Sequence, residues 1–272
     1  MDIIIGKAIW GMTGSLQEKI EKIAQAGYNA IEGPVPEAVS PSEFRALVEQ
    51  YNLHYIAQMI TAGGNEAAEH AASFHERLSR AAEYGPLFVN CHTGRDSMEW
   101  SEQQLMFEQA LKSESIIGVP VAHETHRSRC MFTPWTTAKI LRAFPEIQLS
   151  ADFSHWVCVT ESHLSLYADD VDLALSRTLH VHGRVGFVHG PQVPDPRAPE
   201  YAEDVRVHEA WWSQIYKHRL QAGAERFTFT PEYGPPGYMH TLPYTRQPLA
   251  DLWDVCSWGR DRAIQWMAES NK

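Results

Sequence analysis

The sequence predicts an α/β protein in which eight parallel strands close into a barrel surrounded by helices, the (β/α)8 or TIM barrel, as a single domain over residues 1–272. Three observations predict this fold. Short apolar runs alternate eight times with longer amphipathic stretches, which is typical of parallel strands joined by crossover helices. The length of 272 residues is close to the roughly 250 residues of such barrels. Finally, no change of composition splits the chain, and the Gly-rich nucleotide-binding motifs are missing, so a closed barrel is favoured over an open sheet.

The first half of the chain contains four strand–helix units. Ser15 is the expected N-cap of the first helix and Gly27 its C-terminal stop. In the second helix, Pro41 occupies the first turn and the Ser-x-x-Glu spacing is that of a capping box. The predicted strands are 3–12, 28–35, 54–60 and 86–94, and the predicted helices are 15–27, 40–52, 65–84 and 97–116.

The second half repeats the same alternation. Thr133 is the expected cap of a helix with Pro134 in its first turn. A long Pro-rich connection, 189–205, is expected at the catalytic rim, either as a substrate lid or as a packing flap. The predicted strands are 119–126, 147–153, 179–187 and 226–233, and the predicted helices are 133–144, 163–178, 207–223 and 248–270.

Charge and composition restrict the partners. The formal net charge is −11, and an acidic surface repels a phosphate backbone, so nucleic acid is not expected as a partner. The first ten residues do not resemble a signal peptide, and no run reaches the roughly 18 apolar residues of a membrane span. The four cysteines are widely spaced, which indicates reduced thiols rather than a disulfide framework or a zinc ribbon. We therefore expect a cytoplasmic protein without a membrane segment.

Potential ligands cluster at the predicted C-terminal ends of the late strands, where barrels of this kind carry their chemistry. Strand side chains alternate between faces. In the fifth strand the small Ala122 suits the crowded interior, so Glu124 is expected to point inward as well. In the seventh strand His182 lies nearer the rim than His180, and in the eighth Glu232 shares the inward face with two threonines.

We therefore expect Glu124, Asp152, His182 and Glu232 to converge from four consecutive strands. Three carboxylates and one imidazole suit Mn²⁺, and also Mg²⁺, Co²⁺ or Fe²⁺. Burying three carboxylates together is costly without a cation or raised pKa values. Taken singly, these residues have simpler interpretations, because Asp152-x-x-His155 could be a turn after a strand and Glu232 could belong to a loop.

Five segments together resemble one known family, the xylose isomerase-like TIM barrels, which include sugar isomerases and epimerases, inositol-pathway dehydratases and apurinic endonucleases. The segments are VNCHTGRD (89–96), PVAHETHRSR (120–129), LSADFSHW (149–156), LHVHGRVG (179–186) and FTPEYG (229–234). The resemblance covers nearly the whole chain. It implies that Glu124, Asp152, His182 and Glu232 bind one divalent ion, with Mn²⁺ favoured and Mg²⁺, Co²⁺, Fe²⁺ or Zn²⁺ as alternatives.

The resemblance also implies a reaction. Glu124 and Glu232 would shuttle protons on opposite faces of a substrate carbon, and His155 would contact a substrate oxygen. His92 and His126 are further expected substrate contacts. The family often has a Lys or an Asp-bearing segment after the seventh-strand histidine. This chain has Arg184 near that position, which suits an anionic or polyhydroxy group.

The expected function is the isomerisation or epimerisation of a ketose or keto-polyol through a metal-stabilised enediolate, so the expected partner is a carbohydrate. The alternative is a lyase, a dehydratase or eliminase acting on a keto-sugar or inositol derivative, because proton abstraction beside a carbonyl is common to both reactions. A DNA-repair endonuclease and a barrel that only binds its ligand are further alternatives. A homo-oligomer is compatible with the sequence.

Overall fold

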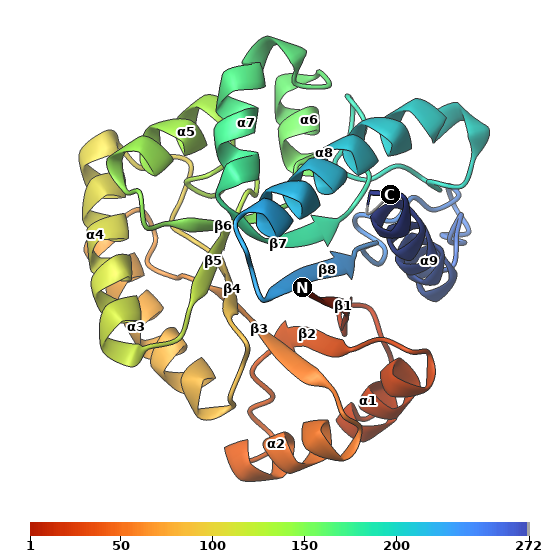
Figure 1. Cartoon of the computed structure of the whole chain (residues 1–272), viewed down its shortest axis with the longest axis horizontal. Helices are drawn as coiled ribbons and strands as arrows, with labels where there is room; N and C mark the ends of the chain where they lie inside the picture. Colours follow the sequence, from red (N-terminus) through yellow and green to blue (C-terminus); the bar gives the residue numbers. More distant parts are fainter. Residues whose placement is uncertain (271–272) are drawn as a thin grey trace.

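The computed structural model describes residues 1–270, and its eight strands form a closed parallel barrel in the order β1 to β8. Figure 1 shows the strands in the centre of the molecule and the helices around them. The predicted barrel is therefore confirmed. The strands are β1 (Asp2–Ala8), β2 (Ala30–Pro34), β3 (His54–Ile60), β4 (Val89–His92), β5 (Val121–Glu124), β6 (Gln148–Ala151), β7 (Thr178–Gly183) and β8 (Arg226–Pro231).

Helices connect the strands and form the outer layer (Figure 1). Ser15 and Ser40 cap the first two helices, as predicted, and each forms a capping box with the glutamate three residues later, which the sequence analysis predicted only for the second helix. The helices are α1 (Leu16–Gln25), α2 (Pro41–Gln50), α3 (Ala67–Glu83), α4 (Trp100–Ile117), α5 (Pro134–Ala143), α6 (Ser154–Thr160), α7 (Ala168–Ser176), α8 (Ala202–Gln221) and α9 (Leu252–Ser270), with short 3₁₀ turns η1 (Ser165–Tyr167) and η2 (Pro199–Tyr201).

Successive inward positions of the strands form layers inside the barrel. The lower layer is an apolar cluster of buried side chains: Ile4, Ala30, Ile56, Phe88 and Ala122. In β2 to β5, the next inward position lies two residues further toward the C-terminus and is polar: Glu32, Gln58, Asn90 and Glu124. The barrel interior therefore changes from apolar to polar toward the C-terminal ends of the strands.

The outward strand side chains pack against the helices. Phe229 of β8 contacts Trp212 of α8 and Trp266 of α9 through edge-to-face rings, with ring centroids 5.3 and 5.9 Å apart. These rings fill the space between β8 and the two helices that cover it. Among residues 1–270, no helix combines the length and the hydrophobicity needed to cross a membrane.

Several predicted boundaries were wrong. The third strand has its predicted bounds, 54–60, but the others are shorter than predicted, so Asp152, Arg184 and Glu232 lie immediately after their strands rather than within them. Helix α6 was missed, because its seven residues are short, largely buried and lack a side-chain N-cap. Helix α8 begins at Ala202, five residues before the predicted start, and the acidic residues of its first turn were the overlooked signal.

The Pro-rich segment before α8 packs against the loop that follows β8. Gln192 donates to the carbonyl of Gly234 at 3.3 Å and accepts from the Gly234 N–H at 2.6 Å. The hydroxyl of Tyr233 donates to the Pro194 carbonyl, and Val193 is fully buried. These contacts fit the packing-flap alternative.

Candidate metal centre

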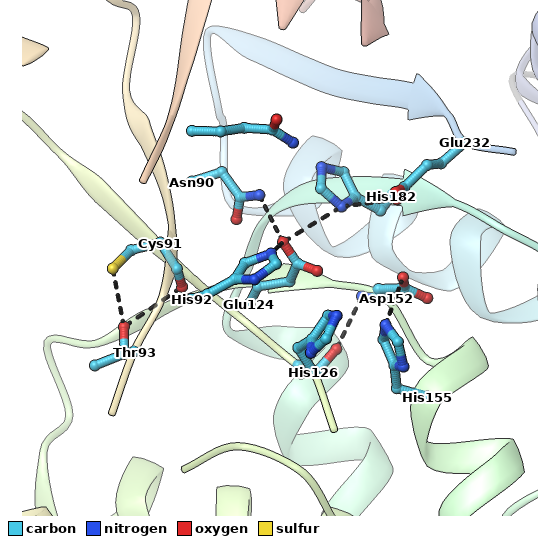
Figure 2. A network of polar contacts seen from close by, with 12 residues as sticks. Asn90, Cys91, His92, Thr93, Glu124, His126, Asp152, His155, His182 and Glu232 are labelled. Atoms are coloured by element: carbon cyan, nitrogen blue, oxygen red, sulfur yellow. Dashed lines mark hydrogen bonds and ion pairs between the residues drawn. The ribbon is translucent and has the colours of Figure 1, made fainter. Parts of the chain in front are cut away.

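The four predicted ligands lie together at the C-terminal end of the barrel (Figure 2). Glu124 is the last residue of β5, and His182 is the next-to-last residue of β7. Asp152 and Glu232 directly follow β6 and β8. Parallel strands bring their C-terminal ends to one edge of the barrel, which is why residues so far apart in sequence meet here.

Two of the predicted carboxylate ligands approach ring nitrogen Nδ1 of His182. This nitrogen lies 3.0 Å from Glu232 Oε2 and 3.6 Å from Glu124 Oε2. Ligand atoms of Asp152, His182 and Glu232 all lie within 4.8 Å of one another. His182 Nδ1 and Glu232 Oε2 are both buried and make no hydrogen bond. Unsatisfied buried donors and acceptors are costly, so two such atoms facing each other fit a site for a cation.

The electrostatics of these groups are strongly perturbed. Burial raises the pKa of Asp152, assisted by Glu232 and Glu124, while the guanidinium of Arg184 opposes the rise. Burial alone would lower the pKa of His182, but the carboxylates of Glu32, Glu232 and Glu124 outweigh it and raise that pKa well above its ordinary value. A group of negative charges that draws positive charge onto a buried imidazole is a natural place for a divalent ion.

Arg184 is the fixed cation of the site. Its Nη2 lies 2.9 Å from Asp152 Oδ2 and 2.8 Å from Glu232 Oε1, and its Nε donates to the same Asp152 oxygen at 3.0 Å. The guanidinium lies against the ring of Tyr238, 4.4 Å from the ring centroid, while Nη1 is buried without a hydrogen-bond partner. One donor of Arg184 therefore has no partner among the described residues.

Glu124 is held by two neighbours on β4. Asn90 Nδ2 donates to Glu124 Oε2 at 2.6 Å, and His92 Nε2 lies 2.7 Å from the same oxygen (Figure 2). Burial would raise the pKa of Glu124, but the imidazoles of His92 and His182 lower it well below its ordinary value. Glu124 is therefore an oriented carboxylate with a second oxygen, Oε1, that takes no part in these contacts.

The two remaining predicted substrate contacts line one wall of the site. The rings of His126 and His155 are 3.9 Å apart between centroids, and His155 Nε2 lies 3.5 Å from Asp152 Oδ2. Burial lowers the pKa of His126 to about 4 and that of His155 well below its ordinary value, so both imidazoles are neutral. Both ring nitrogens of His155 lack a hydrogen-bond partner, and this residue also groups with Glu124 and Asp152 as a potential ligand.

Sequence reasoning missed two residues of this site. Tyr238, in the loop after β8, places its hydroxyl 3.4 Å from His126 Nε2 and packs against Trp10. Nothing in the local sequence marks it. Glu32, the middle residue of β2, contacts His182; the sequence placed it at the end of the second strand but did not group it with the ligands.

The comparisons with known proteins agree with this architecture. The model of the xylose isomerase-like TIM barrel family matches residues 20–228, and this chain therefore belongs to that family. No curated protein matches the chain.

Solved structures of three differently named proteins share the fold. A D-allulose 3-epimerase from Methylomonas sp., in complex with D-allulose, has a TM-score of 0.64 at 14% identity, with 97% of each chain covered. Endonuclease IV from Thermus thermophilus has a TM-score of 0.61 at 18% identity, covering 99% of this chain and 100% of that one. A probable 3-DHS dehydratase from Bacillus anthracis has a TM-score of 0.60 at 10% identity, covering 96% and 98%. At such identities the likeness concerns the fold alone.

Proposed function

We propose that this protein is a divalent-metal-dependent isomerase or epimerase of a ketose or keto-polyol. The observation that carries the proposal is the convergence of two glutamates on one ring nitrogen. Glu124 and Glu232 approach His182 Nδ1 from β5 and β8, which are separated by two strands in the barrel. Carboxylates from separate strands can reach one substrate carbon from different sides, which is what proton removal and return on opposite faces requires.

Glu124, Asp152, His182 and Glu232 would hold the ion. A divalent cation held there would supply Lewis-acid polarisation of the substrate carbonyl. One glutamate then takes the proton from the carbon next to this carbonyl, and the other returns a proton to give the isomer or epimer. Arg184 Nη1 and the neutral imidazole of His155 are the free groups that would orient substrate oxygens.

The lyase alternative requires a proton donor at the leaving group. His126 and His155 are near the predicted ligands, but burial lowers the pKa of both, so neither carries an extra proton near neutral pH. The endonuclease alternative requires a surface that attracts a phosphate backbone, whereas the net charge is −11. Both observations favour the isomerase proposal.

Exchange of carbon-bound hydrogen with solvent tests the proposal. The Mn²⁺-loaded protein is incubated in D₂O with D-fructose, D-allulose or L-ribulose, and NMR follows deuterium uptake beside the carbonyl. We expect uptake with formation of the isomer or epimer and without loss of water. Glu124→Gln and Glu232→Gln should each reduce the rate at least about 10²-fold, which is the low end of general acid–base contributions.

Glu225→Gln is the matched control, because Glu225 lies at the opposite end of β8 with its side chain 89% exposed. It should retain wild-type exchange. Deuterium uptake coupled to elimination would establish the lyase instead, and full activity in either active-site variant would remove that glutamate from the proton-transfer role.

A further inference from the structure

Glu32 is a fourth buried carboxylate beside the candidate metal centre. It makes no contact with Glu124 or Glu232, the two glutamates of the proposed proton transfer. Its side chain, on β2, is fully buried. Oε1 lies 2.8 Å from Nε2 of His182, and Oε2 lies 3.4 Å from Nε2 of His180. Gln58 of β3 donates to Oε1 at 3.2 Å. Glu32 thus contacts Nε2 of His182, while Nδ1 of the same ring faces the other carboxylates.

This contact determines which nitrogen of His182 carries the proton. An ionised carboxylate only accepts hydrogen bonds, so Nε2 must be the N–H donor to Glu32 in the neutral imidazole. Gln58 Nε2 donates to the same Oε1, so this oxygen already acts as a hydrogen-bond acceptor. In the neutral imidazole that binding of a cation requires, the proton on Nε2 leaves the lone pair of Nδ1 pointing toward Glu232 and Glu124.

We propose that Glu32 is a positioning residue that fixes the Nε2–H tautomer of His182 and strengthens Nδ1 as a ligand for a divalent cation. The inference rests on the metal centre of the proposed function. A carboxylate that accepts the second N–H of a ligating histidine orients the ring and increases its basicity. Glu32 has the position and the charge for this role, and among residues 1–270 no lysine or arginine forms an ion pair with it that would explain a buried anion in another way.

A second metal site is the competing interpretation of the same residues. Ligand atoms of Glu32, His180 and His182 lie within 4.8 Å of one another, and Glu32 Oε2 and His180 Nε2 make no hydrogen bond. The 2.8 Å separation between Glu32 Oε1 and His182 Nε2 favours the positioning role, because it is the distance of a charge-assisted N–H···O bond. The number of ions bound per chain distinguishes the two.

Metal affinity is the primary measurement. Mn²⁺ binding to the full chain is measured by competition with a chromophoric chelator, and bound metal is counted by elemental analysis. Glu32→Gln should weaken Mn²⁺ binding about 10- to 100-fold while the protein retains one site. Glu37→Gln, five positions later in the loop after β2, is the matched control and should bind Mn²⁺ like the wild type.

A second measurement separates positioning from simple stabilisation of the fold. Nitrogen-15 NMR of the wild-type Zn²⁺ form reports the His182 tautomer directly, and we expect the proton on Nε2. Thermal unfolding of the metal-free proteins measures the stability cost of removing the carboxylate partner of His182 and His180, and Glu32→Gln should melt below the wild type but stay folded at the temperature of the Mn²⁺ titration. Glu32→Asp, which keeps the charge but shortens the reach, should lie between the wild type and Glu32→Gln in Mn²⁺ affinity.

The outcomes are distinct for the two proposals. A wild-type protein that binds no divalent ion overturns both the metal centre and the role of Glu32. Unchanged Mn²⁺ affinity in Glu32→Gln, or a proton on Nδ1, overturns the role of Glu32 alone. Two ions in the wild type and one in Glu32→Gln would make Glu32 a ligand instead of a positioning residue.

Discussion

Replacing Arg184 by methionine should make the stability of this protein depend on bound metal. Arg184 is 2% exposed and is the cation that joins Asp152 to Glu232. Removing one partner of a buried ion pair costs about 3–5 kcal/mol, because the remaining charge is left uncompensated. Methionine has a similar length and no charge, so the loss is mainly electrostatic.

The expected shift in melting temperature follows from the size of the protein. An unfolding entropy of about 2 cal/mol/K per residue, applied to 272 residues, converts that cost into a fall in Tm of roughly 5–9 °C for the metal-free protein. A divalent ion at the site supplies positive charge to the same carboxylates. The difference in Tm between variant and wild type should therefore shrink when Mn²⁺ is added in excess.

Scanning calorimetry of the wild type and Arg184→Met, each with chelator and with Mn²⁺, measures this difference in Tm. Arg142→Met is the control, because the Arg142–Asp170 pair is at the surface, with the arginine side chain 59% exposed. Such a pair contributes at most about 1 kcal/mol. A Tm difference for Arg184→Met that is the same with and without Mn²⁺ would refute the reasoning, since it would show that the ion and the guanidinium do not neutralise the same carboxylates.

Two further predictions concern stability around β7. Burial lowers the pKa of His208 to about 4, and the neutral ring accepts from Gly186 N–H and donates to the Asp204 carbonyl. The stability contributed by neutral His208 is present above the unfolded-state pKa of about 6.5 and is lost as the pH falls from there toward 4, by up to about 3 kcal/mol. Urea unfolding of His208→Gln should therefore show a weaker dependence on acid pH than the wild type over this window. Gly183→Ala would place a Cβ 2.2 Å from the Phe229 ring and should destabilise the fold by about 1–3 kcal/mol in the same assay; an unchanged midpoint would mean that the ring moves freely.

The sequence predicted the barrel because local signals repeated consistently. The eightfold alternation, the serine caps at positions 15 and 40 and the Thr133–Pro134 start of α5 all act over a few residues. The same logic failed for α6, which has only seven residues and buries the first four, Ser154 to Val157. Tertiary burial stabilises that helix, and no periodicity of a seven-residue apolar segment can show it.

The candidate site also has a part that the sequence predicted and a part that it did not. Strand-end position and alternation predicted that Glu124, Asp152, His182 and Glu232 would converge, and the structure brings them together. Their roles as ligands remain a proposal. The contacts around them followed no local rule, since Tyr238 belongs to an irregular loop that folds back over the barrel end.

The sequence by itself determined the order of strands and helices and the end of the barrel at which its charged residues would gather, because those properties depend on short-range patterns. Only the tertiary structure decided which charged groups face one another. Glu32 and His182 are 150 positions apart and meet because barrel closure directs the inward side chains of β2 and β7 into one polar layer. The tautomer that we propose for His182 therefore depends on the closed barrel and not on any one segment of the chain.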